Sequence, residues 1–402
     1  MKASKGAVTF DDRASVLRAL QNAKMAASAH AYVRGATVRF YEWLEVNHSW
    51  SIPQGPAIWI CGDCHLGNLG PIADTEGHVQ VQIRDLDQTV IGNPAHDLIR
   101  LGLSLATAAR GSDLPGITTV RMIETLMEGY ESAFPENDEP HPEKPQAVKV
   151  VMKKAMKRTW KKLARDRIDD TDPVIPLGKR FWPLVREERK AIEALFSAPA
   201  LGELVTQINH RTDGARIKVI DAAYWRKGCS SLGKLRYAVL LDVDGGSING
   251  DDLCLIDIKE ANKAAAPHAR GAVMPRDQAR RVVEGARHLS PALGDRMRSA
   301  SLLDKPVIIR ELLPQDLKLE IEHLDREEAI KAARFLASVV GHAHCRQMDA
   351  KTRSTWRKEL QRNRSKTLDA PSWLWSSVVD LVAEHERGYL EHCRKYVLLD
   401  QG

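Results

Sequence analysis

The sequence predicts an α+β protein with two lobes. Three observations predict this class: helix-like periodicity fills both ends of the chain, a block between them is rich in strand-like segments, and 402 residues are enough for two or three domains. We expect a large lobe in residues 1–215, a β-rich small lobe in residues 216–325, and C-terminal helices in residues 326–402 that complete the large lobe.

The composition is that of an ordinary globular protein. Hydrophobic residues make up 43% and charged residues 28%, which excludes collagen-like, wholly disordered and low-complexity chains. No apolar run approaches the ~18 residues of a membrane span and the first residues contain no signal-peptide stretch, so we expect a soluble, cytoplasmic protein without a membrane partner. The 59 Lys and Arg against 53 Asp and Glu permit anionic ligands without demanding nucleic acid.

The N-terminal part predicts helices around a pair of strands. Apolar residues recur at helical spacing over residues 13–46. Short runs of β-formers then predict strands at 57–63 and 78–85, which flank a loop at 62–70. Two strongly apolar helices follow at 97–110 and 117–134.

A linker and a basic stretch follow these helices. Residues 134–145 combine Pro with acidic residues, which is typical of a linker. Residues 149–165 contain eight Lys or Arg and no acid. This stretch is either a helix that faces phosphates or a solvated helix face, and we favour the solvated face because charge runs usually lie on the surface.

The central block is rich in strands, and helices follow it. Short runs rich in β-forming apolar residues predict strands at 216–225, 234–243, 253–261 and 305–314. Helical periodicity predicts helices at 277–289, 327–346 and 372–397. The chain therefore runs from helices with two strands, through a β-rich block with one helix, to helices again.

The chemically most informative residues lie in the first loop and at the end of the second strand. Asp63 and Asn68 are five residues apart in the loop, and Asp85 ends the strand that follows, so all three side chains are expected at one loop edge. Phosphoryl transfer uses such a set: one carboxylate orients or deprotonates the acceptor hydroxyl, while an Asn and a second Asp hold Mg²⁺ against the phosphates. The alternative to a phosphoryl-transfer site is a polar hairpin that is followed by an ordinary helix N-terminus.

The motif GDCHLGN…IRDLDQTVIGNPAHDL resembles the catalytic and metal-binding loops of aminoglycoside and choline phosphotransferases, which belong to the protein-kinase-like superfamily. The resemblance implies that Asp63 is the catalytic base and that Asn68 and Asp85 are the metal ligands. It also implies that Asp97 is the structural acid that opens the next helix. Asp87 is a weaker candidate, which could assist the metal site without touching the ion.

The β-rich block resembles the small lobe of kinases. Gly228, Ser230, Ser231 and Gly233 lie in a glycine-containing hairpin whose backbone N–H groups can approach phosphates, and Lys259 at the end of a following strand can neutralise them. Ser230 occupies the position of the middle glycine of the usual G-x-G-x-x-G pattern.

The resemblance assigns further roles around this hairpin. Glu284, on the helix after the lysine strand, is the expected ion-pair partner of Lys259, whereas Glu260 is adjacent to Lys259 and should face away from it. The backbone from Glu311 to Leu313 corresponds to the hinge that contacts adenine. His65 is expected to order the catalytic loop through a backbone hydrogen bond.

The order of the motifs is reversed relative to ordinary kinases, because the catalytic loop near residue 63 precedes the lysine at residue 259. A circular permutation explains this order. The chain also resembles the uncharacterised bacterial domain-of-unknown-function family 2252. The shared features include GDCHLGNLG, RDLDQT, IKEA, RVVEGARHL, IIRELLPQDLK and GHAHCR.

These expectations lead to one functional hypothesis and its rivals. We expect an ATP- and Mg²⁺-dependent phosphotransferase that acts on a hydroxyl of an unidentified small molecule or protein. The rivals are a protein that transfers AMP or senses nucleotide, and a nucleic-acid-binding protein that uses the basic stretch. Zinc or redox chemistry at Cys61 and Cys64 is not expected, because no second cysteine pair has zinc-ligand spacing and the six cysteines suggest reduced, structural thiols.

Overall fold

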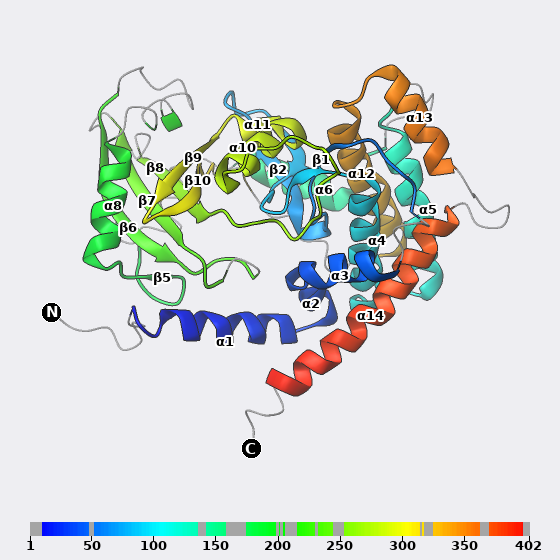
Figure 1. Ribbon diagram of the computed structural model, residues 1–402, viewed down its shortest axis with the longest axis horizontal. Coiled ribbons are helices and arrows are strands. Elements are labelled where there is room, and N and C mark those ends of the chain that lie inside the picture. Colours follow the sequence, from blue (N-terminus) through cyan, green and yellow to red (C-terminus); the bar gives the residue numbers. More distant parts are fainter. Residues whose placement is uncertain are drawn as a thin grey trace.

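We describe the protein from a computed structural model. The described residues are 10–47, 52–135, 142–157, 174–197, 201, 204–205, 215–229, 232–243, 253–313, 316, 325–361 and 370–396. Helices and strands are both abundant among them, which confirms the α+β class. The larger sheet gathers at one side of the molecule and the long helices at the other, and we call these the sheet part and the helical part (Figure 1).

The sheet part is built on a six-stranded sheet in which every neighbouring pair is antiparallel. In spatial order the strands are β5 (Phe181–Trp182), β6 (Ile217–Trp225), β7 (Arg236–Val243), β8 (Leu253–Glu260), β10 (Lys305–Glu311) and β9 (Met297–Leu302). Between β8 and β9 the chain forms α10 (Gln278–Leu289) and the short α11 (Pro291–Gly294). The four strands predicted in this block are confirmed, and the prediction missed β9, whose sequence Met-Arg-Ser-Ala-Ser-Leu holds few β-formers.

Both faces of this sheet are covered. One face packs against α8 (Arg186–Phe196) and α1 (Arg13–Ala26), which contribute Ile192 and Leu17 to its apolar cluster. The other face carries a smaller apolar cluster that includes Trp225 and is joined by Ile175, from the segment before β5. Because β5 pairs with β6, the sheet begins in the chain well before residue 216.

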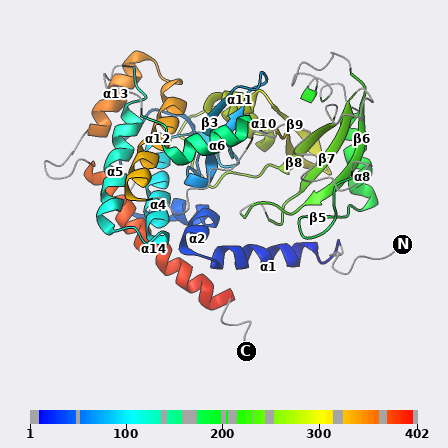
Figure 2. The same ribbon diagram turned by 180° about the vertical axis from the view of Figure 1, so that it is seen from behind.

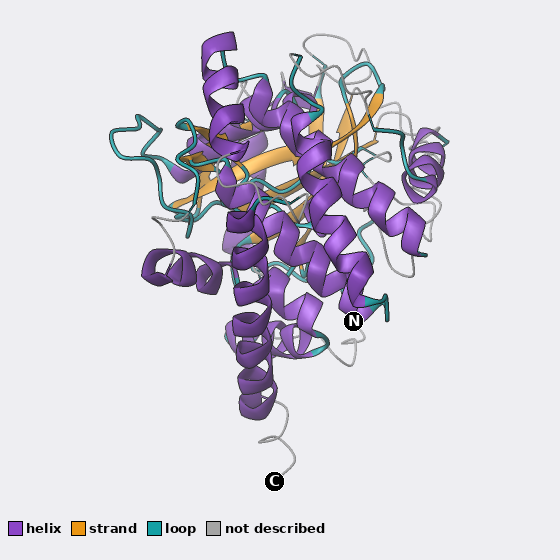
Figure 3. Cartoon of the chain, turned by 90° about the vertical axis from the view of Figure 1, so that its right-hand side faces the viewer, coloured by secondary structure: helices purple, strands orange, loops and turns teal. Residues whose placement is uncertain are grey.

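The helical part packs its longest helices against one another. They are α4 (Ala95–Gly111), α5 (Gly116–Glu131), α12 (Arg326–Cys345), α13 (Ala350–Gln361) and α14 (Ser372–Tyr396). The helices α5 and α12 approach so closely that a Cβ atom at Gly129 would collide with the backbone of Arg334. Viewed from the right-hand side of Figure 1, the helices lie in front of the strands (Figure 3). None of the helices in the described ranges is both long and apolar enough to cross a membrane.

Two small sheets lie between these parts, and the segments that adjoin their strands carry Asp63, Asn68 and Asp85. Strand β1 (Ile58–Ile60) pairs with β4 (Val90–Gly92), and β2 (Leu69–Ala73) pairs with β3 (Val79–Ile83). The two strands predicted to flank the first loop therefore belong to different sheets. The loop itself contains the 3-10 turn η1 (Leu66–Asn68) and the beginning of β2.

The N-terminal helical stretch is divided into three helices. After α1, the side chain of Ser28 caps α2 (Ala29–Gly35), and α3 (Thr37–Asn47) follows a break at Ala36. The capping serine starts a new helix, and hydrophobic periodicity alone did not predict this break.

The helix α6 (Gln146–Met156) follows the linker. Seen from behind, α6 crosses β3 (Figure 2).

The described half of the basic stretch forms the end of α6. Val148, Met152 and Ala155 are its buried residues, and Lys149 pairs with Glu143 at the surface. This arrangement is that of a solvated face on an amphipathic helix. Residues 158–165 of the stretch lie outside the described residues.

Candidate active site

The loop that carries Asp63 is held by Asp97. The carboxylate of Asp97, at the start of α4 and fully buried, accepts hydrogen bonds from the backbone N–H groups of Cys61 and Gly62 at 2.7 and 2.9 Å. The hydroxyl of Tyr41 donates to the carbonyl of Gly62 at 2.6 Å. Asp97 therefore has the structural role that the sequence predicts.

A buried hydrogen-bond chain ties Asp97 to the helical part. The Nε2 atom of His344 donates to Asp97 at 3.1 Å, and Nδ1 of the same ring lies 3.1 Å from the hydroxyl of Tyr130, which in turn accepts from the indole of Trp356. One histidine tautomer, with its proton on Nε2, satisfies every member of this chain. The loop is thus anchored to α12, α5 and α13.

The carboxylate of Asp63 is buried and paired. Its Oδ1 atom accepts from Arg100 Nε at 2.9 Å, and its Oδ2 atom lies 3.8 Å from His65 Nε2. Burial raises the pKa of Asp63 above its ordinary value, although the positive charge of Arg100 opposes the shift. A carboxylate with a raised pKa accepts a proton more readily, so Asp63 is suited to the role of a base.

The loop after Asp63 folds back on it. Asn68 donates from Nδ2 to the backbone carbonyl of Asp63 at 2.9 Å, which orients the amide of Asn68. His65 accepts a hydrogen bond from the Gly67 N–H at 3.0 Å through Nδ1, and burial lowers the pKa of His65, which keeps the acceptor nitrogen neutral. The prediction that His65 orders this loop through the backbone is confirmed.

Lys259 joins the sheet part to the loop that follows β3. Its Nζ atom lies 3.2 Å from both carboxylate oxygens of Asp85 and also pairs with Asp87. Removal from water raises the pKa of Asp85, but the charges of Lys259 and Arg310 outweigh that effect and hold the pKa below its ordinary value. The pKa of Asp87 is raised, first by burial and then by the charge of Asp85. The ammonium of Lys259 therefore bridges two carboxylates whose pKa values are shifted in opposite directions.

These groups surround one small cavity. A space of about 80 Å³ is lined by Asp63, Asn68, Asp85 and Asp87, together with Arg34, His65, Gln88, Gly228 and Cys229. Pockets that hold whole drug-sized ligands occupy roughly 300–1,000 Å³, so this cavity suits an ion and a phosphoryl group rather than a complete nucleotide.

The cavity offers a set of oxygen atoms suitable for Mg²⁺. The Oδ1 atom of Asp87 is buried without a hydrogen-bond partner, which a cation would satisfy. Mg²⁺ usually takes one or two carboxylates and keeps waters or phosphates as its other ligands, so Asp85, Asp87 and the amide oxygen of Asn68 fit such an ion. Among the described residues, no cluster of three or more His, Cys, Asp or Glu side chains could hold a metal by itself.

The glycine hairpin reaches the cavity from the sheet part. Gly228 and Gly233 both have positive φ angles, 91° and 89°, which favour glycine in a tight hairpin. Gly228 lines the cavity, and its carbonyl accepts from Lys24 of α1 at 2.7 Å. Ser230 and Ser231 lie outside the described residues.

The predicted ion pair between Lys259 and Glu284 is wrong. Glu284 lies on the exposed side of α10, 3.5 Å from Arg287 and 3.4 Å from His288. The buried side of α10 instead presents Arg281, which donates to the carbonyls of Asp87 and Asn262 at 2.9 and 2.8 Å. The helix therefore supports the Asp87 loop through a guanidinium on backbone carbonyls.

Glu260 is the other acid considered beside Lys259. It faces away from Asp85 and Asp87: its Oε2 atom accepts from the Leu235 N–H at 2.9 Å, at the base of the glycine hairpin. Adjacent residues on a strand point to opposite faces, as the sequence predicts for Glu260.

The segment predicted as an adenine-binding hinge has internal partners. The carbonyl of Glu311 accepts from Arg296 at 3.0 Å, and the N–H of Leu313 lies 3.4 Å from Asp316 Oδ2. Arg84, next to Asp85, donates to the carbonyl of Asp316 at 3.3 Å. The end of β10 is thus fastened to the loop that carries Asp85, and neither Glu311 nor Leu313 lines the small cavity.

The comparisons with known proteins identify the family. The family model described as an uncharacterised protein conserved in bacteria, DUF2252, matches residues 13–395. The chain belongs to the DUF2252 family. Neither the search of curated proteins nor the search of solved structures found a match.

Sequence reasoning missed several charged residues of this DUF2252 chain. Asp257, two residues before Lys259 and on the same face of β8, accepts from Arg236 at 3.0 and 2.7 Å and from Arg310 at 3.2 Å. Strand alternation could have placed Asp257 beside Lys259. Arg100 was also missed, although it lies three residues after Asp97 on the same helix and therefore on a neighbouring position of its surface.

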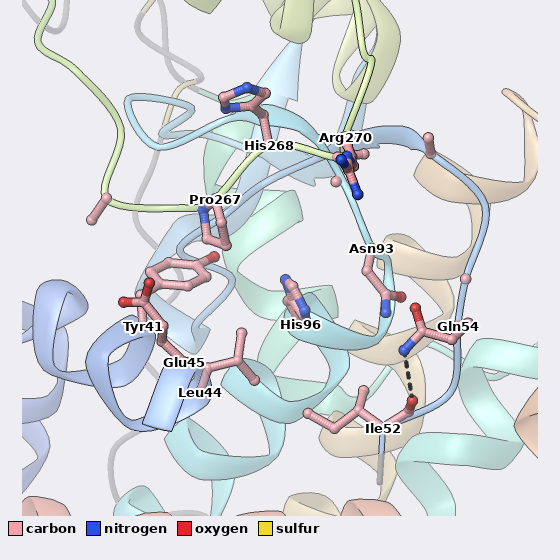
Figure 4. A pocket seen from close by; sticks show the side chains of 15 residues that line it. Tyr41, Leu44, Glu45, Ile52, Gln54, Asn93, His96, Pro267, His268 and Arg270 are labelled. Atoms are coloured by element: carbon pink, nitrogen blue, oxygen red, sulfur yellow. Dashed lines mark hydrogen bonds between the residues drawn. The ribbon is translucent and has the colours of Figure 1, made fainter. Parts of the chain in front are cut away.

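A second, larger pocket lies on the other side of the Asp63 loop in the DUF2252 chain. It has a volume of about 590 Å³ and is lined by α3, the start of α4 and the segment 265–270. Figure 4 shows His96 between Leu44 and Asn93, with Pro267, His268 and Arg270 above it. Tyr41 belongs to its wall and also holds Gly62, so this pocket adjoins the Asp63 loop.

Proposed function

We propose that the protein is an ATP- and Mg²⁺-dependent phosphotransferase with a two-lobed, circularly permuted kinase-like fold. One observation carries the proposal: Lys259 Nζ at the end of β8 lies 3.2 Å from the Asp85 carboxylate, and Asp63 and Asn68 line the same cavity. Phosphoryl transfer depends on bringing a base, metal ligands and a phosphate-binding lysine together, because positioning and charge neutralisation dominate its catalysis.

The arrangement of the sheet part supports the proposed relation to kinases. Counted from β6, Lys259 lies on the third strand, and the glycine hairpin connects the first strand to the second. In protein kinases a glycine-rich loop covers the phosphates and the lysine lies on the third strand. Here the helical elements with Asp63 precede the sheet part and α12 follows it, which is the order that a permuted chain would have.

In this proposal the phosphate groups of ATP lie between the glycine hairpin and the carboxylates. Lys259 and backbone N–H groups of the hairpin would bind phosphate oxygens, and Asp85, Asp87 and Asn68 would hold Mg²⁺. The ion supplies neutralisation of the charge that develops on the phosphates. Lys259 would then exchange part of its contact with Asp85 and Asp87 for contact with the phosphates.

Asp63 would act on the acceptor hydroxyl. Its carboxylate takes the proton of the hydroxyl as the acceptor oxygen forms a bond to the γ-phosphorus, and the bond from that phosphorus to the bridging oxygen breaks, so that ADP leaves with the electron pair. Arg100 fixes the Asp63 carboxylate through Oδ1 and leaves Oδ2 for the acceptor.

The proposal is tested by nucleotide binding and product analysis. ATP with Mg²⁺ should raise the melting temperature of the wild type, since a ligand that binds only the native state stabilises it. Asp85→Asn should lose the Mg²⁺-dependent part of this shift, whereas the surface control Asp349→Asn should keep it. Slow release of ADP supports phosphoryl transfer. Release of pyrophosphate, or no effect of Mg²⁺ on ATP binding, contradicts it.

A further inference from the structure

A third cavity, beside the glycine hairpin, is strongly basic. It has a volume of about 580 Å³ and lies between the segment before β5, the end of β6 and α1. Among the described residues, its lining contains no Asp or Glu and five basic side chains, which are Lys24, Lys179, Arg180, Arg226 and Lys227. We call it the basic pocket.

Most of these cations are not neutralised within the protein. Lys24, Lys179, Arg180 and Arg226 have no carboxylate partner among the described residues; Lys24 donates instead to the carbonyl of Gly228. Lys24, Lys179 and Arg180 are exposed, so solvent rather than an ion pair compensates their charge. The charge of these four side chains is therefore available to a ligand.

Lys227 differs from the other four because it is largely withdrawn from water. Its Nζ atom lies 4.0 Å from the centre of the Trp225 ring. Burial lowers the pKa of Lys227 to about 7, and the nearby charges of Arg236, Arg310 and Arg84 lower it while Asp257 raises it. An anion in the basic pocket would stabilise the charged form of this amine.

The basic pocket adjoins the small cavity around Asp63. Gly228 lines both spaces, so the glycine hairpin separates them. The small cavity takes an ion and a phosphoryl group, whereas the basic pocket has the volume of a pocket for a small molecule. A ligand in the basic pocket therefore lies next to the site of the proposed chemistry.

We propose that the basic pocket binds a ligand that carries two or more linked phosphate groups. A phosphate group carries a charge of about −1.5 to −2, so about two cations balance it, and four uncompensated cations around one cavity match a polyphosphate. Such phosphates come from one of two sources: the nucleotide itself, or an acceptor molecule that is already phosphorylated.

The site is tested with inorganic tripolyphosphate, whose binding is measured by titration calorimetry without Mg²⁺. The wild type should bind tripolyphosphate more tightly than monophosphate, and the affinity should fall with added salt. Lys179→Glu and Arg226→Glu should each weaken binding about tenfold or more, the loss expected for a charged hydrogen bond. The control Lys190→Glu changes the net charge equally on α8 outside the pocket and should alter affinity less than about twofold.

Two results would overturn the proposal. One is equal binding of tripolyphosphate by the wild type and by both pocket variants. The other is much tighter binding of a single-stranded oligonucleotide than of tripolyphosphate with the same dependence on Lys179 and Arg226, which would make the pocket part of a nucleic-acid surface. Circular dichroism of each variant establishes that the loss does not come from unfolding.

Competition identifies the source of the phosphates. If ATP displaces tripolyphosphate, the basic pocket holds the phosphates of the nucleotide. If ATP and tripolyphosphate bind together, the pocket holds a phosphorylated acceptor. The proposed phosphotransferase function is tested independently of the basic pocket. If Mg²⁺ has no effect on ATP binding by the wild type, that function is contradicted, whereas tripolyphosphate binding and its sensitivity to Lys179→Glu still support the pocket.

Discussion

The ammonium of Lys259 lies 3.2 Å from both carboxylate oxygens of Asp85, although 174 residues separate them. Lys259 ends a buried strand and is only 6% exposed, so its charge needs a partner close by. Asp85 and Asp87 provide that partner from the loop after β3. This contact fastens the sheet part to the motif that carries Asp63.

The contrast between Lys259 and Glu284 gives the first prediction. Lys259→Met should lower ATP turnover by about 100-fold or more, because it removes a positive charge from the proposed phosphate site. Glu284→Gln should remain close to wild type, since Glu284 lies at the surface with Arg287 and His288. Steady-state ADP release measures both. A large loss in Glu284→Gln would restore this residue to the nucleotide site.

Replacement of the base gives the second prediction. Asp63→Asn should lower kcat by about 10²- to 10⁴-fold, the usual contribution of a general base, while the ATP-induced shift in melting temperature persists. The amide still offers an oxygen to Arg100, so the loop should keep its fold. Turnover equal to wild type would exclude Asp63 as the base.

The buried acid at the start of α4 gives a prediction about stability. Asp97→Asn should reduce the free energy of unfolding by about 1–3 kcal/mol, because an amide nitrogen would face the N–H donors of Cys61, Gly62 and His344 and leave a buried donor unsatisfied. Urea denaturation measures this loss.

A matched control for Asp97→Asn exists at the surface. Asp325 caps α12 through a hydrogen bond from the Glu328 N–H, and asparagine caps helices about as well as aspartate. Asp325→Asn should therefore unfold at nearly the same urea concentration as the wild type. Equal stability of Asp97→Asn and Asp325→Asn would show that the buried hydrogen bonds of Asp97 are dispensable.

Because the amine of Lys227 is buried, we expect the stability of the protein to depend on pH. Its pKa of about 7 in the folded protein lies below the ordinary lysine value of 10.5, so the unfolded chain binds more protons between these values. The cost of charging Lys227 is present in full below about pH 7 and disappears as the pH rises towards 10.5.

Lys227→Met tests this dependence. The variant should be more stable than the wild type at pH 6, and the difference in unfolding free energy should shrink as the pH rises from 7 to 10. For Lys190→Met, at the surface of α8, the difference from wild type should not change in this way. A constant difference for Lys227→Met across this range would mean that Lys227 is fully charged in the folded protein throughout.

Local patterns in the sequence were sufficient for many of the elements and for part of the site. Short apolar runs rich in β-formers predicted β6, β7, β8 and β10, because a strand covered on both faces of a sheet leaves a nearly continuous apolar run. The run from Asp63 to Asp97 placed the Asp63 loop, the acid that holds it and the ordering role of His65, since these contacts lie within one short stretch of chain.

Only the tertiary structure decided which elements meet. Three contacts join distant parts of the chain. Strand β1 pairs with β4, Arg281 rather than Glu284 of α10 contacts the Asp87 loop, and Lys179 and Lys24 line one pocket. Periodicity states which side of a helix or strand is buried, but the partner on that side depends on how whole elements pack. The sequence therefore determined many of the elements and the grouping of Asp63, Asn68 and Asp85 near one loop, and packing decided the partners of Lys259 and the surroundings of the site.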